Sequence, residues 1–158
     1  MITEIDLKKA IVSLLQSRYV TSQYHYYGIE VSEGNKRPYF FTDLRLLTQQ
    51  DETANIVSKK YFVAITYQPK QISEIDNFEK VEEIRQLLCC NDDRNRKRKM
   101  TIKVKDRYIK IDDFSFTYVG EETNILQIQM NLNFLEFAEQ KAIEPFVEEV
   151  NVKQNIKE

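Results

Sequence analysis

The chain has 158 residues, of which 42% are hydrophobic and 30% are charged, and its formal net charge is −2. This length and composition predict one folded domain with a real core and exclude a wholly disordered chain. No stretch approaches the roughly 18 apolar residues of a membrane span, and the charged start MITEIDLKKA does not resemble a signal peptide, so we expect a protein made and kept in the cytosol, with no membrane partner.

Residues 3–18 are predicted to form an amphipathic helix. Thr3 and Asp6 have the spacing of a capping box, with Asp in the place of the usual Glu. Apolar residues then recur at the helical spacings i, i+4, i+7 and i+8. They are Leu7, Ile11, Leu14 and Leu15.

Three strands are expected next. The tyrosine-rich run 24–31 (YHYYGIEV) and the run 39–47 (YFFTDLRLL) predict two strands that pair as a hairpin through the turn signal at 33–36. Residues 48–58 are polar and predict a loop. Residues 60–68 (KYFVAITYQ) predict a strand rich in aromatic and β-branched residues. Because both faces of this strand are fairly apolar, we expect it in the centre of a sheet, covered on both sides.

A second helix is predicted from Ser73, its N-cap, to about Leu88, with Glu74 and Asp76 favourably placed in the first turn. Its expected buried stripe is Phe78, Val81, Ile84, Leu87 and Leu88. Its expected solvent face is Glu79, Lys80, Glu82, Glu83 and Arg85. The charged residues 91–99 that follow predict an exposed loop or hairpin tip.

The last third of the chain predicts a short hairpin, 101–105 with 107–111, whose second strand continues to Tyr118. The adjacent acids at 112–113 break the alternation of that strand, which predicts a bulge or bend. Residues 120–123 (GEET) predict a turn into the final strand.

The final strand, 124–137 (NILQIQMNLNFLEF), carries the clearest pattern in the chain. Apolar and polar residues alternate strictly, which is typical of a half-buried strand. The polar face consists of uncharged amides, which could lie under the edge of a helix, face solvent or meet a neighbouring subunit. They are Gln127, Gln129, Asn131 and Asn133.

The element order is therefore α-β-β-β-α-β-β-β, and we predict an α+β fold in which a mostly antiparallel sheet is flanked by two helices. Residues 1–138 form the predicted domain, and residues 139–158 a C-terminal arm. The arm could be a terminal helix or an added strand, and we favour packing on a neighbour over a frayed tail. Its expected contact residues are Phe146, Val147, Glu148 and Glu149.

No catalytic, cofactor or metal site is predicted. His25 is the single histidine, and the spacing supplies no orienting acid or nucleophile for it. Cys89 and Cys90 are adjacent, so we expect buried small side chains at a helix end and no structural disulfide. The acid pairs 112–113 and 121–122 could suggest a cation or nuclease site, but neighbouring strand residues point to opposite faces, which favours a bulge and a turn.

Charge is unevenly spread along the chain. Nine basic residues and one acid lie between Arg94 and Lys110, so that stretch is +8 and the rest, by difference from −2, is −10. A solvated hairpin, a contact with an acidic protein surface and a nucleic-acid site are the open interpretations. In a ring of identical subunits, this basic region could meet acids such as Glu136, Glu139, Glu144, Glu148 and Glu149 of the next copy. The densest cluster is Arg94, Arg96, Lys97, Arg98 and Lys99.

Six segments of the chain carry a resemblance to a known family. They are the N-terminal helix, PYFFTDLRL (38–46), YFVAITYQP (61–69), EIDNFEKVEEIRQLL (74–88) and the closing strands IKIDDFSFTYVG and NILQIQMNLNFL. In their order and spacing they resemble the phage tail terminator family, the small tail-completion proteins of phages and prophages of low-GC Gram-positive bacteria. The resemblance covers about residues 3–137. Family members often end soon after the final strand, so the arm is a departure.

This resemblance implies a structural virion protein without enzymatic activity or cofactor. It implies a hexameric ring that caps the tail tube, stops its polymerisation and connects to the neck, head or collar, in a virion or tail-like particle assembled in the bacterial cytoplasm. Expected partners are the tube protein, in contractile tails the last sheath disc, and a neck or head-completion protein, with DNA passing only transiently. The alternatives are another head–tail joining component and a small nucleic-acid-binding module that uses residues 94–110.

Overall fold

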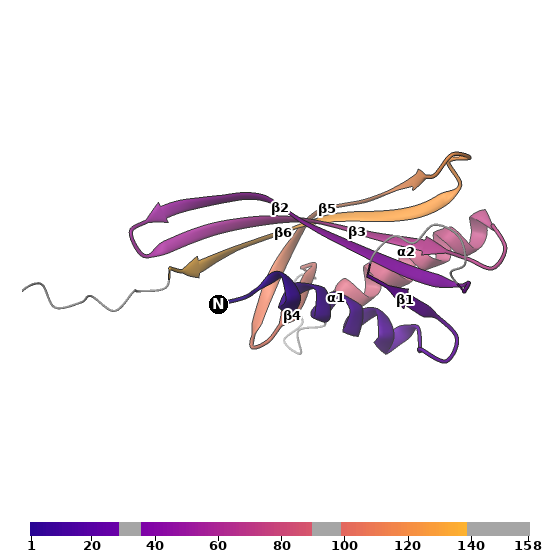
Figure 1. The fold of residues 1–158 in the computed structure, drawn as a ribbon, viewed down its shortest axis with the longest axis horizontal. Helices are drawn as coiled ribbons and strands as arrows, with labels where there is room; N and C mark the ends of the chain where they lie inside the picture. The colour runs from indigo at the N-terminus through magenta and orange to yellow at the C-terminus, as the bar shows by residue number, and fades with distance from the viewer. Residues whose placement is uncertain (29–35, 90–98, 139–158) are drawn as a thin grey trace, which may run out of the picture.

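The computed structural model describes residues 1–28, 36–89 and 99–138. Within them the chain forms two helices and six strands in the predicted order (Figure 1). The helices are α1 (Glu4–Arg18) and α2 (Glu74–Leu88). The strands are β1 (His25–Tyr27), β2 (Tyr39–Thr53), β3 (Ile56–Gln68), β4 (Thr101–Val104), β5 (Arg107–Val119) and β6 (Ile125–Phe137). The α+β fold class is therefore confirmed.

The six strands form one sheet in the order β1-β2-β3-β6-β5-β4, and both helices lie on the same side of it (Figure 1). All pairings are antiparallel except that of β1 with β2. The core lies between the helices and this face of the sheet. Leu7, Ile11 and Leu15 of α1 pack there with Leu126, Ile128 and other even-numbered residues of β6. We call this the helix face, and the opposite side the open face.

The helix starts are as predicted. Thr3 and Asp6 form a complete capping box, and the Ser73 hydroxyl accepts a hydrogen bond from the Asp76 amide. Each cap satisfies amide groups that the first helical turn leaves without an intrahelical partner. α2 ends at Leu88, with the partly exposed Cys89 as its C-cap, so Cys89 is less buried than expected.

Two predictions about the second strand are wrong. β1 and β2 pair in parallel, His25 opposite Tyr39, and so do not form a hairpin. Residues 48–58 are not a loop, because β2 continues to Thr53 and β3 begins at Ile56. The two strands form one long hairpin that extends well beyond the helices (Figure 1).

Strand β3 is central, as predicted, but the described helices cover only one of its faces. It pairs with β2 on one edge and β6 on the other, and Tyr61, Val63 and Ile65 are buried on the helix face. On the open face Phe62 and Thr66 are only half-buried, because both described helices lie across the sheet from them. The apolar residues on both faces of β3 were therefore not a sign that helices cover the strand on both sides.

The buried face of α2 is rotated from the predicted stripe. Ile84 and Leu88 are buried as expected, but Lys80 is also buried, and Phe78 is 48% exposed. The helix therefore meets the sheet along Asn77, Lys80 and Ile84, three and four residues apart, which is one face of a helix.

The predicted bulge in β5 is present. The register shifts between Asp112 and Ser115, and Asp113 has a φ of 54°. Such a shift is the signature of an extra residue in one strand. The β4–β5 hairpin and the turn after Gly120 are also as predicted.

The arm 139–158, Cys90 and the basic residues Arg94, Arg96, Lys97 and Arg98 lie outside the described residues. β6 ends at Phe137, and the Ala138 amide donates to the Asn55 carbonyl, 2.9 Å away, beside the β2–β3 turn. The predicted domain boundary at residue 138 stays a prediction. No helix among the described residues is long and apolar enough to cross a membrane.

Candidate interaction surfaces

The four predicted amides lie together on the open face, in consecutive odd positions of β6. Gln127 Nε2 donates to Thr66 Oγ1 of β3, 3.2 Å away, and Gln129 Nε2 donates to Gln127 Oε1 at 2.8 Å. These side chains are half-buried. Because both described helices cover the other face, these amides do not lie under the edge of either of them, and within the described residues this surface is left to solvent or a neighbour.

The other two amides bind the acids of the bulge. Asn131 Nδ2 donates to Asp113 Oδ2 at 2.8 Å, and Asn133 Nδ2 donates to Asp112. Asn131 and Asn133 share a face, so both carboxylates lie over it, and the prediction that adjacent acids point apart is wrong here. The bulge is the physical reason, because it interrupts the alternation of side chains.

These acids are held by amide and ammonium groups. Lys110 Nζ lies 2.9 Å from Asp112, and its hydrogen bond, with that of Asn133, lowers the pKa of the Asp112 carboxyl. Across the described parts of the chain, no group of three His, Cys, Asp or Glu side chains is placed to hold a metal ion. The bulge therefore belongs to a hydrogen-bonded polar surface.

The open face ends in an apolar patch at the tip of the long hairpin. Phe137 is 81% exposed and Leu135 is 54% exposed. Ile56 of β3 lies directly opposite Phe137 of β6, and Leu135 is two residues from Phe137 along β6. Neighbouring apolar side chains at the projecting end of a sheet are typical of a contact surface.

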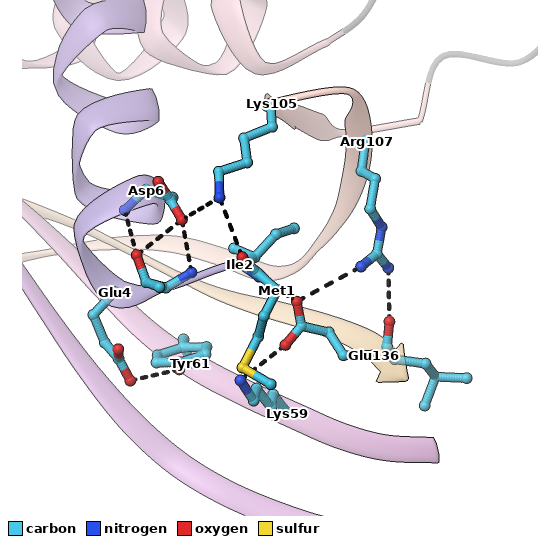
Figure 2. Close-up of polar contacts among 11 residues, drawn as sticks. Met1, Ile2, Glu4, Asp6, Lys59, Tyr61, Lys105, Arg107 and Glu136 are labelled. Atoms are coloured by element: carbon cyan, nitrogen blue, oxygen red, sulfur yellow. Dashed lines mark hydrogen bonds and ion pairs between the residues drawn. The ribbon is translucent and has the colours of Figure 1, made fainter. Parts of the chain in front are cut away.

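A buried ionic cluster lies on the helix face near the same end of the sheet (Figure 2). Glu136 Oε2 lies 2.9 Å from Lys59 Nζ, and Glu136 Oε1 accepts from the Ile2 amide at 2.5 Å. Arg107 Nη1 lies 3.8 Å from the same carboxylate. Burial alone raises the pKa of Glu136, but the hydrogen bonds from Lys59 and the Ile2 amide outweigh it and lower the pKa.

The suggestion that Glu136 contributes to an acidic edge is therefore wrong. Its side chain is 4% exposed, and it joins the first residues of the chain to β3 and β6. The other suggested acids, Glu139, Glu144, Glu148 and Glu149, lie outside the described residues.

The described part of the basic segment is largely paired within the subunit. Lys105 Nζ lies 2.8 Å from Asp6 Oδ2 and donates to the Met1 carbonyl at 3.1 Å (Figure 2). Arg107 donates to the Leu135 carbonyl at 2.7 Å, and Lys110 pairs with Asp112. Lys99 is exposed. These internal pairs do not favour the use of residues 103–110 as a phosphate-binding surface.

A buried lysine is the main structural residue that the sequence pattern missed. Lys80 Nζ lies 5.2–5.7 Å from the ring centroids of Tyr19, Tyr24 and Tyr67 and 3.3 Å from Asp76 Oδ1. Tyr67 Oη in turn donates to Asp76 Oδ2 at 2.9 Å. The i, i+4 spacing of Asp76 and Lys80 was the available signal for the ion pair. This cluster joins α2 to the sheet and to the end of α1.

Comparison with known protein families decides the identity of the chain. A family model described as "Phage tail terminator protein" matches residues 6–144, which is most of its length. The chain belongs to this phage tail terminator family. A search of curated proteins finds no match.

Membership assigns the protein a structural role in completing a phage tail, in contact with other tail proteins, and makes it a component of the virion tail. The surfaces described above are therefore candidate assembly contacts, and non-enzymatic function is in keeping with the family. The matched region includes α1 except its first two residues, α2, all six described strands and the first residues of the C-terminal arm.

Proposed function

We propose that this protein assembles as a hexameric ring that caps the tail tube at the tail–neck junction. The ring stops tube polymerisation and joins the tube to the neck or head, and in a contractile tail it also meets the last sheath disc. The observation that carries the proposal is the family match over residues 6–144.

The shape of the subunit supports a ring. The β2–β3 hairpin with its apolar patch projects at one end, and the β5–β6 turn and α2 lie toward the other (Figure 1). Unlike ends suit a heterologous contact, in which one surface meets a different surface of the next copy, and such contacts form a ring when the rotation from copy to copy closes.

We place the subunit and partner contacts on three regions. The first is the basic loop, Arg94, Arg96, Lys97, Arg98 and Lys99. The second is the amide face of β6, Gln127, Gln129, Asn131 and Asn133. The third is the arm, with Phe146, Val147, Glu148 and Glu149. The basic loop belongs at contacts and not in the lumen, because clustered cations there would retain passing DNA.

Imaging and mass measurement test the ring directly. The purified full chain should have the mass of a hexamer by light scattering, and negative-stain images should contain rings of the tube diameter. Rings should also cap tubes when the tube protein is added. A monomer that forms no rings either alone or with tube protein would contradict the proposal. A monomer that slows the migration of short oligonucleotides in a gel would favour the nucleic-acid alternative.

A charge-reversal variant tests the role of the basic loop. Replacing Arg94, Arg96, Lys97, Arg98 and Lys99 with glutamate should dissociate the ring, and high salt should weaken the wild-type ring, because screened or reversed charges lose their attraction. The control is Lys70→Glu, which reverses the charge of an exposed lysine outside the basic loop. If the charge-reversal variant and the wild type in high salt both stay hexameric, the basic loop does not contribute to the interface, but the proposal of a ring still holds.

A further inference from the structure

One edge of the sheet is free along most of β2. β1 pairs only with Tyr39–Phe41, and in the described chain no other strand pairs with that side of β2. From Arg45 to Thr53 every residue of β2 is exposed. Unpaired amide and carbonyl groups on a long edge form a template for an additional strand.

This edge carries exposed apolar side chains as well. Leu46 and Leu47 are 46% and 49% exposed, at the first of the two register shifts of β2. Between the shifts, Thr48–Asp51 pairs regularly with β3 and so keeps straight strand geometry. The exposed part of β2 thus offers backbone pairing and a place for apolar side chains.

The chain outside the described residues contains a matching strand sequence. Residues 146–152 read FVEEVNV, rich in β-branched and aromatic residues, and place Phe146, Val150 and Val152 on one side of an extended chain. Pro145 comes directly before them, at the start of a strand, where a missing amide is tolerated. These seven residues are short enough to pair within the nine-residue exposed run Arg45–Thr53.

The path of the chain favours the edge of a different copy. β6 runs toward the tip of the hairpin and reaches it at Ala138, which bonds to Asn55 of the turn. To reach its own β2 the chain would have to reverse there. Residues 139–144 (EQKAIE) contain none of the usual turn-forming residues Gly, Pro, Asn, Asp and Ser, so the sequence carries no signal for a reversal before Pro145.

We propose that residues 146–152 of one subunit add as a strand to the free edge of β2 in a second copy of the chain. In a ring each subunit donates one such strand and accepts another, which closes the circle by heterologous contacts. This inference rests on the proposed ring for the identity of the acceptor, and it specifies how two of its subunits are joined.

Disulfide trapping tests the inference on the full chain, with Cys89→Ser and Cys90→Ser to remove the native thiols. Val150→Cys is combined in turn with Thr48→Cys, Gln49→Cys or Gln50→Cys, so that the register of pairing is sampled. At least one pair should give, on mild oxidation, a ladder of covalent dimers and larger species that a reductant collapses. The matched control combines Val150→Cys with Thr117→Cys, on the exposed part of β5 at the other side of the sheet, and should give no ladder.

Mass measured before oxidation separates this inference from the ring itself. A hexamer that gives no ladder with any β2 position, or a ladder only with Thr117→Cys, would overturn strand addition and leave the ring standing. A band that is linked only within one chain would also overturn it. Deletion of residues 139–158 should raise the concentration at which the ring dissociates by about tenfold or more, because several backbone hydrogen bonds are lost at each contact.

Discussion

Replacing Glu136 with glutamine keeps the shape of the side chain and removes its charge. The Lys59 and Glu136 side chains are only 10% and 4% exposed, so the Lys59 ammonium would be left buried without its counterion. Breaking a buried ion pair by removing one partner costs about 3–5 kcal/mol. Glutamine still offers an oxygen to the Ile2 amide, and the more exposed Arg107 at 3.8 Å adds little, so we expect a loss of about 3 kcal/mol.

Urea unfolding at pH 7, followed by circular dichroism, measures this loss directly. In thermal unfolding of a domain of this size, a loss of about 3 kcal/mol should lower the melting temperature by roughly 6–12 °C. Glu82→Gln is the matched control, because Glu82 pairs with Arg85 on the solvent side of α2 and both side chains are about half exposed. That substitution should change the unfolding free energy by less than about 0.5 kcal/mol.

A second variant tests the cause of the loss. Lys59→Met in the Glu136→Gln background removes the unpaired ammonium and should restore more than half of the lost stability. If Glu136→Gln costs no more than Glu82→Gln, or if Lys59→Met deepens the loss, the buried pair does not have the role assigned to it.

Three further results are expected. Because the pKa of Glu136 is lowered from 4.5, its carboxylate contributes its full stabilisation above that pH and loses it as the pH falls through the folded-state pKa. Urea titrations at successive pH values should therefore show that the wild type loses more stability than Glu136→Gln below about pH 4.5. Parallel curves of unfolding free energy against pH for the two proteins would contradict this. Lys80→Met should lower the unfolding free energy by about 1–2 kcal/mol, because it removes the ion pair with Asp76 and three cation–π contacts. Lys70→Met, at an exposed site, should leave the unfolding free energy unchanged in the same assay. Equal effects of the two substitutions would contradict the stabilising role of Lys80. Asp113→Val should lower the unfolding free energy by about 1–2 kcal/mol, because a β-branched residue is strained at a φ of 54°. Asp113→Asn should have nearly the wild-type unfolding free energy. Equal melting temperatures for the two variants would argue against backbone strain at this position.

Much of the fold could be predicted because its signals are local. The caps at Thr3 and Ser73 set the helix starts, and the alternation in 124–137 identified a strand with one buried face. The bulge was also visible locally, as two adjacent acids in an otherwise alternating strand.

The errors concern contacts between distant segments. Residues 48–53 show no alternation of burial because the hairpin extends past the helices, so neither face meets a core, and a polar strand there looks like a loop. The parallel pairing of β1 with β2 leaves no periodic signal that differs from a hairpin. Lys59 and Glu136 meet only because β3 and β6 pair, and nothing local distinguishes them from solvent-exposed charges.

The candidate surfaces divide in the same way. The amide face was predicted because it repeats along one strand, and the position of its acid partners was not, because it depends on a bulge in the neighbouring strand. The apolar patch at the tip required the register of Ile56 with Phe137, which only the paired sheet defines.

The position of β6 has a consequence for when the subunit becomes competent to assemble. Among the described strands it is the last in sequence, yet it lies in the middle of the sheet between β3 and β5, and Glu136 binds the amide of Ile2. While the chain is still being synthesised, the sheet therefore remains in two unjoined halves until β6 has left the ribosome. Such long-range pairing forms late and slowly. A growing chain therefore cannot occupy the end of a tail before residues 125–137 have been made, and a chain terminated before residue 125 lacks the strand that joins the halves.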